Sequence, residues 1–595
     1  MDKNTIIAIV LSVIVITVGM GIQTAFFTPE LPPEEVSVST EVNNAVLPEA
    51  SGGNITAVGE DPDASPFEVR AGSYIITFDP KGASVSSIRL SEHLDNGEPV
   101  ELLFRDESDD NAFMLYLGED SSKPIDAVFS HTESVNQNGL NIVSFTRDFI
   151  TEDGKPFTIR KQFAIPDNGE YMIQLSVDVS TPDGSAIPVN VSSAMYSISV
   201  GPQIGPEFES ISNNYDYRRV SVRYDEKGKS DVRFNDGSFT SDEERNVDWI
   251  ALSGKYFTFM LIPETDSIIS SAWATETSSD TGVPQKDTIY LTRSVSSESH
   301  VQDMYSFYAG PKVKSSLSIY DNADDNIFRI EGHELTDIID GSWLSWLESI
   351  LNWILQLFYK IIPNYGVAII LLTILIKLLL QPLAKKGMDS NAKMGALTPK
   401  LNEIKERYPD DPEAQNAAMA KLYKEEGINP MGSCLPMLIQ FPIFIALYGL
   451  LNTNFDLRGS MFIPGWIPDL SIPDTIFTLP FSIPLLGSQI HLLPILYTIS
   501  MIFSMKITQM GTQASAGSQA GMMKFMTYGM PLIFFFIMYN APSGLLLYWS
   551  TVNVISIGQQ VFVNKKKKDV YAEEIAERDA EKAAKKEAKR KNRRK

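Results

Sequence analysis

A lysine stands inside an otherwise apolar segment in the second half of the sequence. Lys377 lies within residues 367–380, which read VAIILLTILIKLLL. A lysine at the centre of a bilayer costs about 3 kcal/mol on insertion scales and roughly 10 kcal/mol or more on an isolated helix. Such a charge requires a polar environment, and an ionisable residue inside a membrane segment marks a candidate functional site.

Two further polar residues share a helical face with this lysine. Thr373, Lys377 and Gln381 follow one another at intervals of one turn. In one interpretation Lys377 extends its ammonium to the headgroups at the Lys385 end, roughly 12 Å away. In the other, its face lines a polar cavity. We favour the cavity, because a whole stripe of this helix requires water or polar partners.

Other apolar segments carry polar residues that are suited to the same cavity. Trp549, Asn553, Ser556 and Gln560 repeat at spacings of 4, 3 and 4 on one segment, and Gln440 lies on another. If these faces converge on Lys377, the helices enclose a hydrated concavity with one fixed positive charge. Alternatively, they form ordinary interhelical hydrogen bonds worth about 0.6 kcal/mol each. That alternative is the better one for Gln440 or Ser556 alone, but the buried lysine favours the concavity for the group.

The sequence offers little for catalysis. His333-Glu334 resembles the start of a zinc-protease motif, but Asp337 stands where the second histidine is required. The chain has only five histidines and contains no phosphate-binding loop, no nucleophile elbow and no intramembrane carboxylate pair. We therefore expect a protein that is not an enzyme, with no catalytic residues, no metal site and no cofactor.

Charge divides the 595 residues into two unlike parts. The net charge is −24, yet residues 341–595 carry 27 basic against 19 acidic residues, so residues 1–340 carry 23 against 55. A soluble acidic domain therefore precedes a membrane domain with basic ends. Cys434 is the only cysteine, so the chain forms no internal disulfide.

Six apolar segments are expected to cross a membrane, and basic residues orient them. Residues 384–429 hold eight basic residues and the tail after Val563 holds fourteen, whereas residues 452–490 hold only Arg458. Both termini are then cytoplasmic and residues 28–356 are exported. The expected spans are 6–22, 357–383, 434–451, 491–507, 523–539 and 544–563.

The remaining segments complete the expected domain plan. The first span is expected to be an uncleaved anchor rather than a signal peptide, and a disordered acidic linker is expected to follow it. Short β-rich runs separated by turn signals then predict a large antiparallel sandwich. A tryptophan-rich segment is expected to be an amphipathic helix on the membrane surface, or alternatively an extension of the next span. The expected boundaries are 1–27 for the anchor, 28–66 for the linker, 67–330 for the β domain, 341–356 for the amphipathic helix, 357–563 for the membrane core and 564–595 for the basic tail.

Two cytoplasmic segments are candidates for binding partners. Residues 385–427 predict a helical hairpin that turns at YPDDP, with Pro399 either opening its first arm or kinking a longer helix. Its eight basic and eight acidic residues suit a docking arm or a solvated surface equally well. The tail, with fourteen basic and seven acidic residues, suits ribosomal RNA or anionic lipid, or it only fixes the C-terminus in the cytoplasm.

Four segments of the membrane half resemble the YidC membrane-protein insertases. They read NYGVAIILLTILIKLLLQPLAKK, AKMGALTPKLNEIKERY, LYKEEGINPMGSCLPMLIQFPIFIALY and NAPSGLLLYWSTVNVISIGQQ, and the exported domain with FYAGPKVKSSL resembles the diderm bacterial form. The resemblance covers essentially the whole chain. It implies a five-helix insertase core after the first helix, a galactose-mutarotase-like β-supersandwich outside the inner membrane, and a hydrophilic groove open to cytoplasm and lipid.

The resemblance also implies roles for individual residues. The family's groove arginine corresponds to Lys377, its substrate-contacting threonine to Thr373, and the tyrosine pair of its last helix to Tyr548 and Trp549. Two departures matter here. Lysine lacks the planar donor fork of arginine and loses its proton more readily when desolvated. Tryptophan in place of tyrosine removes a hydroxyl acceptor.

The expected function is therefore membrane-protein insertion and folding assistance without nucleotide hydrolysis. Nascent membrane proteins would be the clients, the lipid bilayer the medium, and the Sec translocon and ribosomes candidate partners. A secondary transporter or channel is the main alternative, although the sequence has no paired intramembrane charges and no evident inverted repeat. An exported carbohydrate-active enzyme on a membrane anchor is a third, but five further spans exceed what anchoring requires.

Overall fold

The structure is a computed structural model in which the described residues lie between 53 and 592. The expected anchor at 1–27 and the first part of the acidic linker lie outside them. The residues left undescribed within these limits are 96, 106–108, 136–138, 207–216, 227–228, 236–237, 242–244, 265–268, 279–283, 340–343, 410, 427–434, 485 and 510–523.

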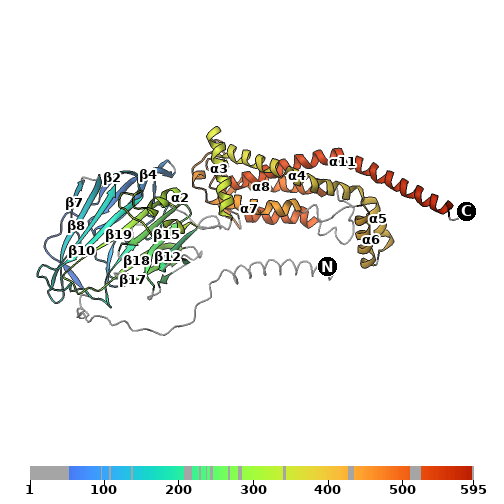
Figure 1. Ribbon diagram of the computed structural model, residues 1–595. Helices are drawn as coiled ribbons and strands as arrows, with labels where there is room; N and C mark the ends of the chain where they lie inside the picture. Colours follow the sequence, from blue (N-terminus) through green and yellow to red (C-terminus); the bar gives the residue numbers. More distant parts are fainter. Residues whose placement is uncertain are drawn as a thin grey trace, which may run out of the picture. The chain divides into compact units, whose positions relative to one another are not determined.

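The first half of the described chain is built of antiparallel strands (Figure 1). They are β1 (Ile55–Ala57), β2 (Phe67–Ala71), β3 (Tyr74–Asp79), β4 (Ser84–Asp95), β5 (Glu98–Glu101), β6 (Leu115–Leu117), β7 (Ser130–Val135), β8 (Leu140–Thr151), β9 (Pro156–Pro166), β10 (Met172–Ser180), β11 (Ala194–Val200), β12 (Arg218–Glu226), β13 (Lys229–Asn235), β14 (Phe239–Thr240), β15 (Val247–Gly254), β16 (Phe257–Pro263), β17 (Ile269–Ser278), β18 (Pro284–Ser294) and β19 (His300–Pro311).

These strands form three sheets around one hydrophobic core. The largest has the order β1-β8-β9-β10-β19-β16-β15-β12-β13, with β7 paired to β8. The others have the orders β14-β17-β18-β11-β6 and β2-β3-β4-β5. Alternate residues of β9, including Phe157, Ile159 and Phe163, are buried, as a strand with one face on the core requires. Buried residues from all three sheets belong to one cluster, so the expected β-rich domain is present.

The β domain extends beyond both of its expected boundaries. Strand β1 pairs with β8 inside the segment expected to be a disordered linker, and the buried Arg147 donates to the Glu60 carbonyl and the Asp61 carboxylate. Acidic composition suggested solvation, but these contacts tie residues 55–61 to the sheet. At the other end, buried residues of 317–338 pack against Trp249 and Tyr308.

The second half of the described chain is mostly helical. Its elements are α3 (Ser345–Ile361), α4 (Tyr365–Ala396), α5 (Thr398–Arg407), α6 (Pro412–Glu425), α7 (Leu435–Thr453), η5 (Phe455–Leu457), β20 (Thr475–Ile483), β21 (Gly487–His491), α8 (Leu492–Gln509), the π-helical turn η6 (Phe525–Gly529), α10 (Met530–Met538) and α11 (Ser543–Asn592), and the short α2 (Lys314–Leu317), η2 (Ser318–Asp321) and η3 (Leu335–Ile338) precede them.

Helix α11 packs along both α4 and α8 and continues past the expected end of its membrane segment (Figure 1). By length and hydropathy, residues 365–382 of α4 suffice to cross a membrane. Shorter apolar helical segments in the described chain are Gln440–Thr453, Leu492–Ile507 and Phe525–Met538. The six expected crossings, of which the first is not described, remain a prediction.

Helix α3 has an exposed apolar face and a polar face that is bonded to the helical part. Trp346, Ile350, Trp353, Leu357 and Ile361 recur at helical spacing and are all more than 40% exposed. On the polar side, Asn352 accepts a hydrogen bond from Asn454, and Gln356 donates to Asp456. Residues 362–364 are not helical and separate α3 from α4. Helix α3 is therefore a separate helix and not an N-terminal extension of the span in α4.

Helices α5 and α6 pack against each other through a small apolar seam. Leu397 and Leu401 are buried, and Met419, Leu422 and Tyr423 pack against them. Pro399 lies in the first turn of α5, and the Asp411 side chain caps α6 by accepting from the Ala414 amide at 3.0 Å. Pro399 therefore opens a helix here rather than kinking a longer one.

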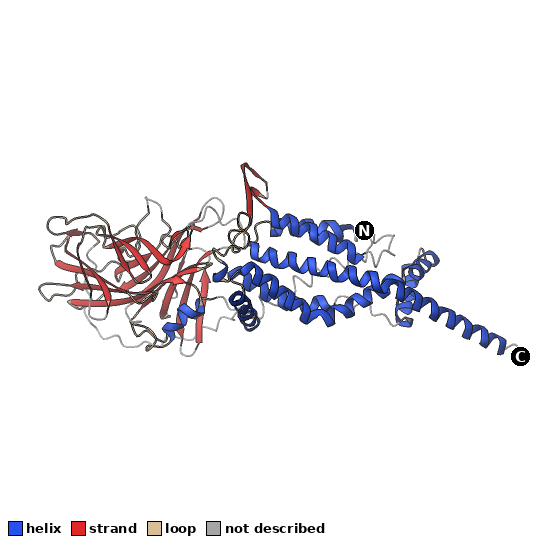
Figure 2. Ribbon diagram, turned by 90° about the horizontal axis from the view of Figure 1, so that it is seen from above, coloured by secondary structure: helices blue, strands red, loops and turns tan. Residues whose placement is uncertain are grey.

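Strands β20 and β21 form a hairpin between α7 and α8, in the segment between two expected spans where the sequence showed no sign of strands. The two strands are antiparallel, with Thr475 opposite His491 and Thr478 opposite Gln489. In Figure 2 they are the isolated red strands beside the helices. The register of this pair is irregular at two points. The two strands therefore lack the regular alternation of apolar and polar residues by which a strand is recognised in a sequence.

Candidate functional site

Lys377 lies where α4 packs along α11. Its ammonium donates to the Ser556 hydroxyl at 3.0 Å, and that hydroxyl donates to the Val552 carbonyl one turn back at 2.7 Å. The lysine side chain is half-buried. Within the described residues no carboxylate lies within ion-pair distance of this ammonium, and its hydrogen-bond partner is the hydroxyl of Ser556.

The other two residues of the Lys377 face have different surroundings. Thr373 is 1% exposed, and its hydroxyl donates to the Ile369 carbonyl of its own helix at 2.7 Å. Gln381 is exposed one turn beyond Lys377. The face therefore runs from a closely packed end at Thr373, through Lys377, to an open end at Gln381.

The polar residues of α11 point to three different helices. Ser556 contacts α4, Asn553 donates to Ser500 of α8 at 3.1 Å, and Tyr548 lies within hydrogen-bonding reach of Gln440 on α7. Gln560 is 8% exposed and also has a polar contact. Spacings of 4, 3 and 4 keep Trp549, Asn553, Ser556 and Gln560 on one side of the helix. Because α11 packs against α4, α7 and α8, residues on that one side contact different helices.

Trp549 is held between two aromatic rings. Its ring stacks on Phe444 of α7 with centroids 5.3 Å apart, and Tyr497 of α8 lies 5.9 Å away. The indole is 7% exposed, and its Nε1 has no hydrogen-bond partner among the described residues. A buried donor without an acceptor is costly in an apolar environment. Sequence reasoning did not identify Ser500, Phe444 and Tyr497, since only the packing brings them to α11.

The helices are tightly packed on the Tyr365 side of Lys377. Buried apolar residues of α4 and α11 fill that side, whereas Leu378 and Leu379, just beyond the lysine, are exposed. The packed residues are Tyr365, Ala368, Ile369 and Leu372 of α4 and Leu545, Leu546 and Leu547 of α11. Lys377 therefore lies at the boundary between a closed and a more open part of the helix pair.

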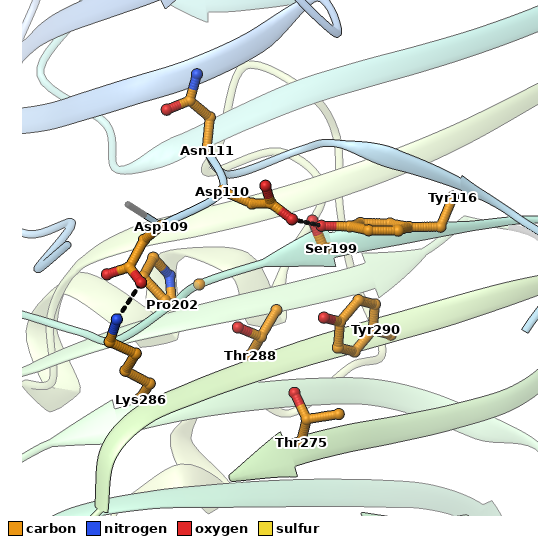
Figure 3. A pocket seen from close by; sticks show the side chains of 11 residues that line it. Asp109, Asp110, Asn111, Tyr116, Ser199, Pro202, Thr275, Lys286, Thr288 and Tyr290 are labelled. Atoms are coloured by element: carbon orange, nitrogen blue, oxygen red, sulfur yellow. Dashed lines mark hydrogen bonds and ion pairs between the residues drawn. The ribbon is translucent and has the colours of Figure 1, made fainter. Parts of the chain in front are cut away.

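The β domain carries a separate polar pocket of about 140 Å³ (Figure 3). Lys286 forms an ion pair with Asp109 in it, and the Tyr116 hydroxyl donates to Asp110 at 2.7 Å. Burial, together with this hydrogen bond, raises the pKa of Tyr116 well above its ordinary value. These charged groups have partners within the domain, which fits a structural role. The described residues contain no group of three metal-ligating side chains.

Two family models match adjoining parts of the chain. The first, described as 60Kd inner membrane protein, matches residues 357–570, and the second, the YidC periplasmic domain, matches residues 67–354. The membrane protein insertase YidC of Treponema denticola is 34% identical over 96% of this chain and 100% of its own length. The chain belongs to the YidC family. That of Treponema pallidum is 33% identical over 95% of this chain and 99% of its own length.

Membership in the YidC family confirms the main sequence-based expectation. The family is one of membrane insertases in the inner membrane, and it is not an enzyme family. A solved structure of an active YidC insertase, with its first transmembrane domain resolved, is 18% identical and covers 92% of this chain and 98% of its own, with a TM-score of 0.34. The periplasmic-domain match agrees with the β-rich first half of the structure.

Proposed function

We propose that this chain inserts membrane proteins by letting their short polar flanks pass along a hydrophilic groove beside Lys377. The contact between Lys377 and Ser556 carries the proposal. An ammonium has three N–H donors, and Ser556 accepts from one of them. The Lys377 ammonium is half-buried, and no carboxylate among the residues that the structure describes forms an ion pair with it. Such a cation is suited to attract acidic residues of a client.

The packing around Lys377 supports an insertase rather than a transporter or channel. A transport path must open to both sides of the membrane in turn. Close packing toward Tyr365 and exposure toward Gln381 instead favour a groove that opens to one side and to lipid. In this mechanism water in the groove lowers the cost of moving a polar flank, and apolar partitioning of the client helix drives insertion.

The groove-lining residues in this proposal are those of α4, α7 and α11 discussed above. Lys377 supplies the charge, Thr373 closes the packed end, and Gln381 lies at the open end. The other proposed lining residues are Gln440, Tyr548, Trp549, Asn553, Ser556 and Gln560.

The same proposal includes a membrane topology. Both termini are cytoplasmic, and residues 28–356 are periplasmic. The exposed apolar stripe of α3 then lies on the periplasmic surface of the inner membrane, with Trp346 and Trp353 at the level of the lipid headgroups. Its polar face remains bonded to the segment after α7.

Reconstitution tests the function directly. The purified full-length protein in liposomes should insert a single-span client in the absence of ATP and GTP, because hydrophobic partitioning supplies the free energy. Insertion is measured as protection of the client's exported flank from external protease. Protein-free liposomes are the control. Activity that appears only after nucleotide is added would contradict the proposed mechanism.

The basic tail should bind ribosomes through phosphate contacts. Residues Lys565–Lys568 and 582–595 form two basic clusters around an acidic segment, and the backbone is helical to Asn592. Co-sedimentation with purified ribosomes should weaken steeply as salt rises, and it should drop on truncation after Val563. If the truncated and full chains sediment equally at every salt concentration, the tail serves only as a topology signal. Anionic liposomes in place of ribosomes test lipid binding.

A further inference from the structure

The β20–β21 hairpin is largely exposed, and apart from the buried His491 at its base it has no ionisable side chain. Residues 475–490 contain no Asp, Glu, Lys, Arg or His. Phe477 is 59% exposed and Phe481 is 60% exposed, and Ile476 is 47% exposed. A two-stranded hairpin alone is marginally stable in water at best, so these side chains require a covering surface.

The base of the hairpin is fixed to the helix ends by buried polar contacts. The Asp474 carboxylate is fully buried and accepts from the Trp466 indole at 2.9 Å and from the first amides of α8, Leu492 and Leu493. Burial raises the pKa of this carboxyl despite those donors.

The second strand is held in the same way. The Tyr539 hydroxyl after α10 donates to the Gln489 carbonyl at 2.9 Å, and its ring contacts His491 with centroids 4.8 Å apart. Ser543 at the start of α11 donates to the Ile472 carbonyl at 2.7 Å. The base of the hairpin is therefore anchored to the ends of α8, α10 and α11.

The direction of the hairpin indicates what covers it. In Figure 2 the two strands project away from the helix ends, at an angle to the helix axes rather than along them. Where helices stand along the membrane normal, an element that projects sideways from their ends lies over the surrounding lipid. The uncharged sequence matches that surface, because headgroup and acyl boundaries accept aromatic rings but penalise buried charge.

We propose that this hairpin inserts Phe477 and Phe481 into the outer leaflet of the phospholipid bilayer at the boundary between headgroups and acyl chains. It thereby fixes the exported ends of α8, α10 and α11 at a defined depth. Since the hairpin is uncharged, its insertion should not depend on salt or on the fraction of anionic lipid. The proposal uses the membrane location of the helices but not the groove, so the two can fail separately.

Site-directed spin labelling tests the depth of the hairpin. The single cysteine permits a Cys434→Ser background, into which Phe477→Cys or Phe481→Cys is introduced in the full chain. After nitroxide labelling and reconstitution in liposomes, collision rates with oxygen and with a water-soluble nickel chelate are measured. Leu378→Cys, on the exposed apolar side of α4, is the lipid reference, and Asp153→Cys, in an exposed turn of the β domain, is the water reference.

Labels at 477 and 481 should collide with oxygen as the Leu378 label does, and several-fold less with the nickel chelate than the Asp153 label. Adding Phe477→Asp to the Phe481→Cys chain should restore nickel collisions at 481 while leaving the Leu378 reference unchanged. Nickel collisions equal to those of Asp153 in the parent hairpin would overturn the proposal. Protection of the labels from the nickel chelate that arises only when a client is added would also overturn the proposal. It would show that the hairpin is covered by clients rather than by lipid.

Discussion

Lys377→Leu should reduce insertion of clients with acidic exported flanks by roughly tenfold or more, equivalent to about 1.4 kcal/mol. The variant removes the cation that contacts Ser556 and leaves the helix more apolar. Unit charges 4 Å apart at an effective dielectric constant of 20 attract by roughly 4 kcal/mol, so even a partly screened charge exceeds this figure. Protease protection in proteoliposomes measures the effect.

Two comparisons separate charge from packing in this experiment. Lys377→Arg keeps the positive charge and should retain insertion. A client with an uncharged flank should be much less affected by Lys377→Leu than an acidic one. Equal insertion of both clients by the leucine variant would eliminate charge attraction as the mechanism.

Much of the helical half could be predicted because its signals are local. Long apolar runs indicated α4, α8 and α11, and the proline pair around YPDDP separated α5 from α6. The β20–β21 hairpin was missed for a physical reason. Its strands contain Pro480 and lack regular alternation, and its base depends on contacts with Asp474 and Tyr539 that only the fold brings together.

The β domain shows the same division between local and distant information. Strand composition predicted an antiparallel domain, but the pairing of β10 with β19 joins Ser180 to His300 and has no local signal. Strand β1 has only three residues in an acidic segment, so composition concealed it. Its position is fixed by pairing with β8, far along the chain.

At the candidate site, helical spacing grouped Thr373 and Lys377 on one face but left the state of each side chain open. The structure has Thr373 bonded within its own helix and Lys377 bonded to Ser556. On α11 the spacing suggested one polar face, whereas neighbouring helices divide it among three partners. Periodicity identifies which residues share a side of a helix, and packing decides what each one contacts.

Deleting the β domain should leave insertion by reconstituted protein largely intact, whereas deleting α3 should abolish it. The structure sets the boundaries of a clean deletion at residues 54–339, because β1 belongs to the large sheet and residues 317–338 pack on Trp249 and Tyr308. Helix α3 instead buries Leu351 and Leu355 in the helical cluster. Its loss should also leave Asn454 and Asp456 without their partners.

The matched comparison for the α3 deletion is a chain in which only its exposed stripe is changed. Trp346→Ser with Trp353→Ser removes two exposed rings and keeps Leu351, Leu355 and the polar contacts. It should weaken insertion less than removal of residues 345–361, since the bundle contacts remain. All chains are compared by client protection at equal reconstituted amounts. Loss of activity on deletion of 54–339, in a protein whose helical content is preserved, would show that the β domain takes part in insertion itself.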